Sequence, residues 1–178
     1  MASNRPTLDE VLQIPDPMLS DNFELFFDKI PGDGVTGSAA AMRIQCKTAT
    51  KPGMTVEQVA LELFGHTVEF AGRLTFTHTM SVEYVENWKG TITRTLEKWI
   101  ELSRSHKTQS GNFKKDYTAN ATLNIFNQAG NISLSYQLTN IFPTNTGELA
   151  FDGASATALS VSAEFSFDSY ELLSENTI

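Results

Sequence analysis

The sequence contains one cysteine, three histidines and six prolines among its 178 residues, and it has no long apolar run. A single thiol cannot form an internal disulfide or a cysteine metal cluster, so Cys46 is interpreted as a half-buried core residue. No stretch approaches the roughly 18 consecutive apolar residues of a membrane helix, and residues 1–20 lack the apolar core of a signal peptide. We therefore expect synthesis in a cytoplasm and no membrane anchoring.

Catalytic and metal-binding patterns are also missing from the sequence. His66, His78 and His106 are far apart and have no metal-ligand spacing, and His78 is interpreted as a hydrogen-bonded core residue. There is no nucleophile elbow, no phosphate-binding glycine loop and no Cys/His pair. Glu164 and Asp168 would lie about 13 Å apart on a strand, too far to form an acid/base pair. We predict that the chain is not an enzyme and has no catalytic, cofactor-binding or metal-binding residues.

The charge balance is acidic. Thirteen Lys and Arg against 21 Asp and Glu give a net charge of -8. Proteins that coat nucleic acid neutralise phosphates with basic side chains, so this balance argues against that class. The one basic segment contains Arg104, His106, Lys107, Lys114 and Lys115.

Alternation of apolar and polar residues dominates the rest of the chain. From Leu159 to Asp168 every odd position is apolar and every even position is polar, which predicts a strand with one buried and one wet face. The same pattern predicts strands at 22–30, 42–47, 59–70, 74–85, 117–125 and 131–138, with turns at 71–72, 127–130 and 145–147. A period of 3.6 residues over 88–101, after Asn87 as a candidate N-cap, predicts one helix with Trp88, Ile92, Leu96, Trp99 and Ile100 on its apolar stripe.

The length suits one mainly β domain. We expect an extended arm at residues 1–21 with a capping box at Thr7 and Glu10, the β domain at 22–172 and a short tail at 173–178. Three glycines with Ser and Ala predict a mobile loop at 31–41.

The wet faces of the strands are long, neutral and rich in Ser, Thr and Asn. Monomeric proteins usually protect exposed strands with charged side chains. The composition therefore leaves two alternatives open. The chain is either a monomeric sandwich with a Ser/Thr-rich surface, or a subunit whose strands pair with neighbouring copies in a closed ring that lines an aqueous channel.

Three segments resemble a known family. Residues 44–49 leading into Pro52-Gly53, residues 70–76, and above all 142–149 (Phe-Pro-Thr-Asn-Thr-Gly-Glu-Leu) are similar to tail tube proteins of contractile-tailed bacteriophages over about residues 22–172. The arm before Asn22 and the loop 31–41 depart from the family pattern. The resemblance implies a β-sandwich or open barrel with one flanking helix. It also implies a relationship to the hemolysin-coregulated protein of type VI secretion, with hexameric rings stacking into a tube.

The resemblance also implies partners and surfaces. Expected partners are copies of the chain itself, the tail sheath protein, and baseplate and terminator proteins, with DNA passing through the virion tail without specific binding after synthesis in the bacterial host cytoplasm. The expected lumen-facing residues are Thr75, Thr77, Thr79, Ser81, Glu83, Ser160, Ser162, Glu164 and Ser166. The expected sheath-facing residues are Arg104, Lys107, Lys114 and Lys115, and the expected ring-stacking residues are Lys51, Met54, Val56 and Glu57.

Two alternatives to a phage tail tube are kept. The first is a tube subunit of a type VI secretion or bacteriocin-type injection machine. The second is a monomeric β-sandwich that binds a ligand.

Overall fold

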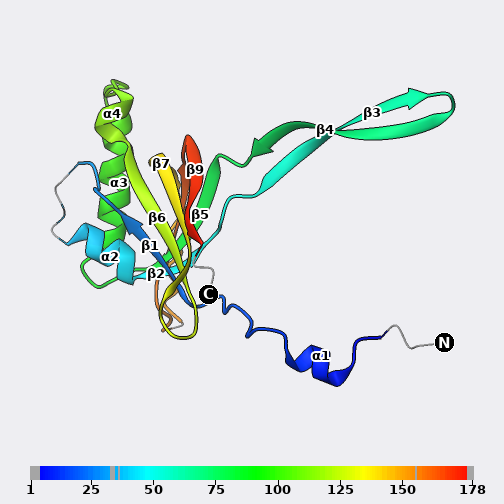
Figure 1. Ribbon diagram of the computed structural model, residues 1–178. Coiled ribbons are helices and arrows are strands. Elements are labelled where there is room, and N and C mark those ends of the chain that lie inside the picture. Colours follow the sequence, from blue (N-terminus) through cyan, green and yellow to red (C-terminus); the bar gives the residue numbers. More distant parts are fainter. Residues whose placement is uncertain (1–4, 33–34, 36, 155, 176–178) are drawn as a thin grey trace.

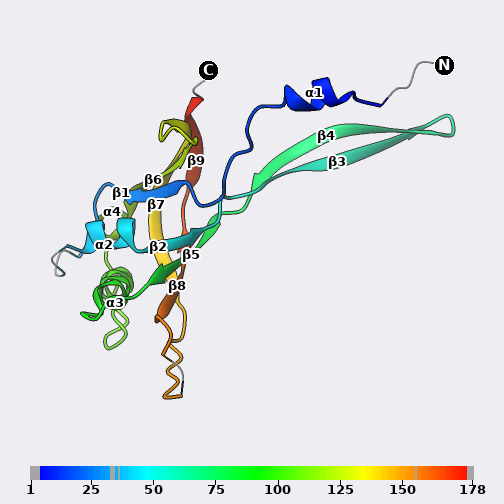
Figure 2. The same cartoon turned by 90° about the horizontal axis from the view of Figure 1, so that it is seen from below.

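The computed structural model describes residues 5–32, 35, 37–154 and 156–175. A β-sheet body carries two projections that leave it on the same side, a long hairpin and the N-terminal arm (Figures 1 and 2). The predicted mainly β architecture with a flanking helix is confirmed. Parts of the predicted arm, of the loop 31–41 and of the C-terminal tail lie outside the described residues.

The described chain forms nine strands and four helices. The helices are α1 (Leu8–Leu12), α2 (Ser38–Ile44), α3 (Thr91–Ser103) and α4 (Lys114–Tyr117). The strands are β1 (Phe23–Phe27), β2 (Cys46–Ala49), β3 (Met54–Leu63), β4 (His66–Phe76), β5 (Thr79–Val85), β6 (Ala119–Phe126), β7 (Ile132–Thr146), β8 (Ser160–Ser166) and β9 (Ser169–Glu175).

Seven strands form one antiparallel sheet in the order β1-β6-β7-β8-β5-β2, with β9 also paired to β7. The long strand β7 belongs to both halves of the body, because residues 134–139 pair with β9 and residues 142–146 pair with β8. Between these segments Asn140 has a φ of 54°, a conformation that Asn tolerates better than most residues. Its side-chain amide donates to Asp168 at 2.8 Å, which fixes the bend where β7 passes from one half to the other.

The core lies between the sheet and α3. Ile92, Leu96 and Trp99 are buried on the inner stripe of this helix, as predicted. The Trp99 ring packs edge-on against Phe27 and Phe165 at centroid distances of 5.6 and 6.0 Å, and its indole N–H donates to the Tyr117 carbonyl. Trp88 was predicted on the same stripe, but it precedes the helix and is 91% exposed.

The N-terminus of α3 is held by a residue that the periodicity did not single out. The Glu86 carboxylate accepts hydrogen bonds from the backbone N–H groups of Ile92 and Thr93 at 3.1 and 2.7 Å. Asn87, the predicted N-cap, accepts from the N–H groups of Lys89 and Thr91, while Gly90 occupies the cap position. Burial opposes ionisation of Glu86, but the hydrogen bonds outweigh it, so the pKa of this carboxyl is lowered.

Two predicted strands are wrong in their boundaries. Residues 38–44 form α2 rather than a loop followed by a strand, because Ala39, Ala40 and Ala41 are strong helix formers and Met42 becomes buried on the inner side. The alternation from 74 to 85 belongs to two strands in different sheets, β4 and β5, separated at Thr77 and His78. The residues on both sides of that break keep the same alternation, so the period of two does not reveal it.

Two predicted turns are also wrong. The reversal expected at residues 71–72 occurs at Phe64 and Gly65, and Gly72 lies at an irregularity inside β4, where an added Cβ would come within 3.0 Å of the Glu57 carbonyl oxygen and of Val59. The turn expected at 145–147 is an extended continuation of β7, and the Gly147 N–H donates to the Ser162 carbonyl at 2.8 Å. A Cβ at Gly147 would lie 1.9 Å from the Ser162 hydroxyl, so close strand approach accounts for this glycine.

Candidate assembly surfaces

The hairpin β3–β4 extends from the body as a separate two-stranded sheet (Figure 1). Its base is anchored where Phe76 packs on His78 and Tyr170 at ring distances of 4.2 and 5.5 Å, and where the Thr77 N–H donates to the Gly53 carbonyl. Beyond this base the two strands pack chiefly on each other. Two-stranded hairpins are marginally stable in water, so a hairpin of this length is suited to be covered by another surface.

The outer half of the hairpin has one apolar and one polar face. Cross-strand partners share a face, and the partners of Val59, Leu61 and Leu63 are Phe70, Val68 and His66. On the opposite face lie Gln58, Ala60, Glu62, Thr67, Glu69 and Ala71. The five apolar side chains of the first face, Val59, Leu61, Leu63, Val68 and Phe70, are 45–53% exposed. We call these five residues the hairpin apolar face.

The four predicted ring-stacking residues lie at the start of this hairpin or just before it. Met54 and Val56 pair with Phe76 and Leu74 in the inner half. The extra residue of the register shift that follows lies in β4, so β3 keeps its alternation and these two residues lie on the face opposite to the hairpin apolar face. Glu57 lies at the register shift. Lys51 precedes the hairpin, and its ammonium lies over the rings of Tyr136 and Tyr170 at 5.1 and 5.7 Å.

Most of the predicted lumen residues come together on β5 and β8. The register pairs Thr79 with Ser166, Ser81 with Glu164 and Glu83 with Ser162, so these six share one face with Ser160. We call this set of seven the wet face. Thr75 instead lies on the hairpin, paired with Thr55, and Thr77 lies in the break between β4 and β5. The opposite face carries Met80, Val82 and Tyr84, which are buried in the core beneath α3.

The wet face carries two carboxylates, and the negative charge of one of them is offset by the nearby Lys47. The Lys47 ammonium donates to Glu83 at 2.8 Å and lowers the pKa of that carboxyl. Glu164 lies two strand positions along β8 from the Ser162 that pairs with Glu83.

The basic segment follows α3 at the far end of the body from α2 (Figure 1). Lys114 is bonded within the subunit, since its ammonium donates to both oxygens of Asp168 at 2.5 and 2.6 Å and lowers the pKa of that carboxyl. Arg104 donates to the Gln109 carbonyl and closes its own loop. Lys107 and Lys115 are exposed, and neither forms an ion pair with another of the described residues.

The N-terminal arm forms the second projection. The predicted capping box is present, with the Thr7 N–H donating to Glu10 and the Glu10 N–H donating to the Thr7 hydroxyl. The short helix α1 buries none of its residues, and Leu8, Leu12 and Ile14 are 67–73% exposed. The arm therefore also presents apolar side chains to solvent.

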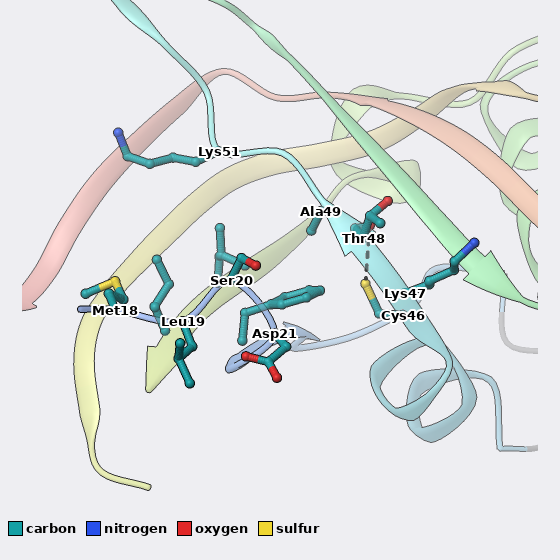
Figure 3. Close-up of a pocket in the computed structure, with 12 residues that line it drawn as sticks. Met18, Leu19, Ser20, Asp21, Cys46, Lys47, Thr48, Ala49 and Lys51 are labelled. Atoms are coloured by element: carbon teal, nitrogen blue, oxygen red, sulfur yellow. Dashed lines mark hydrogen bonds between the residues drawn. The ribbon is translucent and has the colours of Figure 1, made fainter. Parts of the chain in front are cut away.

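A cavity of about 680 Å³ opens where the arm meets the body, between β1, β2 and β6 (Figure 3). Its apolar lining comes from Met18, Leu19, Phe23, Cys46, Ala49, Leu123 and Ile125, with Lys47, Lys51 and Asp21 among the polar residues. Burial raises the pKa of the Cys46 thiol to about 12, so this thiol stays neutral and is a poor nucleophile. Sequence reasoning predicted Cys46 as half-buried but did not find the cavity, because its walls come from three distant segments.

Metal-binding and membrane-spanning features find little support in the described part of the chain. No cluster of three potential metal ligands occurs there. His78 is hydrogen-bonded to the Phe167 carbonyl, as predicted, but it lies near the surface rather than in the core. None of the helices described here has the length and apolar character needed to cross a membrane.

Comparison with known proteins identifies the family. The model of the phage tail tube protein family matches residues 14–173, whereas no curated protein matches the chain.

Among solved structures, the fold is similar to a chain of the anti-feeding prophage baseplate, with 14% identity, a TM-score of 0.63, and coverage of 93% of this chain and 100% of that one. It is also similar to a chain of the extended sheath-tube complex of the extracellular contractile injection system PVC, with 14% identity, a TM-score of 0.61, and coverage of 94% and 98%. A third similar chain comes from the sheath/tube terminator of that system, with 15% identity, a TM-score of 0.63, and coverage of 90% and 99%.

The family match covers most of the chain, including the body, the hairpin and the part of the arm that lines the cavity. It assigns the protein a structural rather than an enzymatic role. The chain belongs to the phage tail tube protein family.

Proposed function

We propose that this protein assembles into stacked hexameric rings that form the tube of a contractile phage tail, and that the tube conducts DNA into the host. The observation that carries this proposal is the hairpin apolar face, which the subunit leaves exposed on a long projection. Monomeric proteins seldom expose contiguous apolar patches of this kind, and a neighbouring copy supplies the missing cover.

A contact made by a projection of one copy on the body of the next is heterologous. Such contacts generate closed rings or open helical assemblies, whereas a self-complementary patch would stop at a dimer. The hairpin and the arm leave the body on the same side, which suits a neighbour that sits between them (Figure 1). The inner half of the hairpin, with Met54, Val56 and Glu57, and the nearby Lys51 are proposed to contact the adjacent ring.

The wet face is proposed to line the lumen. It lies on the opposite side of β5 and β8 from α3, so a ring with α3 on its outside has Thr79, Ser81 and Glu83 inside. Short hydroxyl side chains with Glu83 and Glu164 offer phosphates no cationic partner apart from the Lys47 already bonded to Glu83. DNA is therefore repelled weakly and moves without being held. Thr75 and Thr77 belong to the base of the hairpin and have no place in this lining.

The outer surface is proposed to meet the sheath through Lys107 and Lys115, with Arg104 nearby. Exposed ion pairs contribute only about 0–1 kcal/mol each, which suits a contact that must release on contraction. Lys114 is proposed to have a different role, since its ammonium fastens α4 to Asp168 at the bend of β7.

A tube of an injection machine that carries protein cargo is the second candidate, favoured by the similarity in fold to chains of the anti-feeding prophage and PVC particles. The neighbouring genes distinguish the two, since a phage tube is encoded with capsid and packaging genes. Membership of the tail tube family leaves the monomeric ligand-binding alternative without support.

The test is electron microscopy of the purified full chain in negative stain, together with light scattering over a range of concentrations. We expect rings of uniform diameter and short tubes at high concentration. A single monomer species at every concentration, with no rings, would contradict the proposal.

A further inference from the structure

The tip of the hairpin carries an aromatic residue where the backbone disfavours one. Phe64 and Gly65 form the two-residue turn between β3 and β4, with φ values of 51° and 80°. Turns with two positive φ angles favour Asn, Asp or Gly, and a bulky residue there is a conformational outlier. The Phe64 side chain is also 100% exposed, so no packing within its own subunit compensates for the strain. Strained residues without local compensation are concentrated at functional positions.

The cavity beside the arm has the properties of a site that receives an aromatic side chain. Its volume of about 680 Å³ lies within the range of pockets that hold small ligands, and most of its lining is apolar. Met18 and Leu19 form one wall and Cys46 and Ala49 of β2 another (Figure 3). The neutral thiol of Cys46 adds no charge that would oppose an apolar guest.

The hairpin and the cavity are complementary in charge. Residues 58–71 of the hairpin include Glu62 and Glu69 and no Lys or Arg. At the cavity Lys47 is already paired with Glu83 and the lining also contains Asp21, so Lys51 is the cation that an acidic hairpin can meet. Attraction between the acidic hairpin and Lys51 favours the rate and the orientation of association.

Phe64 cannot reach the cavity of its own subunit. Lys51, which lines that cavity, lies three positions before Met54 at the start of β3. The ten residues of β3 then carry the tip about 33 Å away along an extended strand. That reach is comparable to the diameter of a domain of this size, roughly 40 Å. Only another copy can bring Phe64 to this cavity.

We propose that Phe64 of one copy inserts into the cavity formed by Met18, Leu19, Cys46, Ala49, Leu123 and Ile125 of a neighbouring copy. This inference rests on the proposed assembly into rings and specifies the contact that links successive subunits. The contact is head-to-tail, since each copy gives one tip and receives another.

The first test replaces Phe64 with Asn in the full chain. Asn suits the positive φ, so the hairpin turn should form at least as well, whereas the apolar guest is lost. We expect the dissociation constant for self-association, measured by sedimentation velocity, to rise about 10- to 100-fold, the factor associated with full burial of a Phe side chain. The matched control is Phe113→Asn, which changes another exposed phenylalanine and should leave association unchanged.

The second test identifies the receiving site. A photoreactive benzoyl derivative of phenylalanine at position 64 keeps the aromatic character, and irradiation of assembled protein should yield cross-links to residues 18–21, 46–51 or 123–125. Cross-links to α1, to α3 or to another hairpin would overturn the inference. Tubes that form equally well from Phe64→Asn would also overturn it while leaving the proposed function intact. Failure of the wild-type chain to form rings would overturn both.

Discussion

The decisive perturbation for ring assembly is the replacement of Val59, Leu61 and Val68 by Thr. These side chains belong to the hairpin apolar face and are 53%, 45% and 46% exposed in the isolated subunit. Threonine keeps the β propensity of the strands, so the hairpin should persist while its apolar face is lost.

The magnitude follows from the exposed fractions. Full burial of an aliphatic side chain contributes roughly 1.5–3 kcal/mol, and a neighbour can bury only the remaining half, about 0.7–1.5 kcal/mol for each residue. The triple variant should therefore weaken each contact between subunits by about 2–4 kcal/mol, or roughly 30- to 700-fold in the association constant. The melting temperature of the isolated subunit should change little, because β3 and β4 pack chiefly on each other.

Sedimentation velocity over a concentration series, with negative-stain images of the same samples, measures this effect. Gln58→Thr with Ala60→Thr changes the opposite face of the same strand and is the matched control. Wild-type tube formation by the triple variant would refute the assignment of this face to a subunit contact. Equal loss of assembly in the control would show that both faces of the hairpin are needed for assembly, which contradicts a contact made by the hairpin apolar face alone.

Three further predictions concern other parts of the molecule. Glu86→Gln should destabilise the subunit by about 1–2 kcal/mol through loss of the helix cap. Because folding lowers the pKa of the Glu86 carboxyl, the wild type is more stable than the variant above pH 4.5, and this difference should fade as the pH falls below that value. Thermal denaturation across pH measures the effect. Glu83→Lys with Glu164→Lys should slow DNA ejection without preventing tube assembly, and unchanged ejection kinetics would contradict the lumen assignment. Lys107→Glu with Lys115→Glu should weaken sheath attachment while bare tubes form normally; an intact sheath on the variant would remove these lysines from the contact.

Local sequence patterns are enough to predict the strands whose two faces differ and the helix whose stripe is buried. Val161, Ala163 and Phe165 alternate with Ser160, Ser162 and Glu164, and the structure places the first three in the core. Ile92, Leu96 and Trp99 repeat with the helical period and are buried in α3. These patterns are local, since a residue and its neighbour two or four positions away experience the same partner surface.

Which strands leave the body depends on the packing of the whole chain. The alternation of β3 and β4 resembles that of core strands, yet Leu61 and Phe70 face solvent. Among the described residues, β3 and β4 pair with each other and with no other strand. The break at Thr77 and His78 separates a strand of the hairpin from a strand of the sheet without changing the period of two. The cavity likewise depends on segments from residue 18 to residue 125 meeting in space. Alternation records that one face of a strand is apolar, but it does not record whether the same chain or a neighbouring copy covers that face.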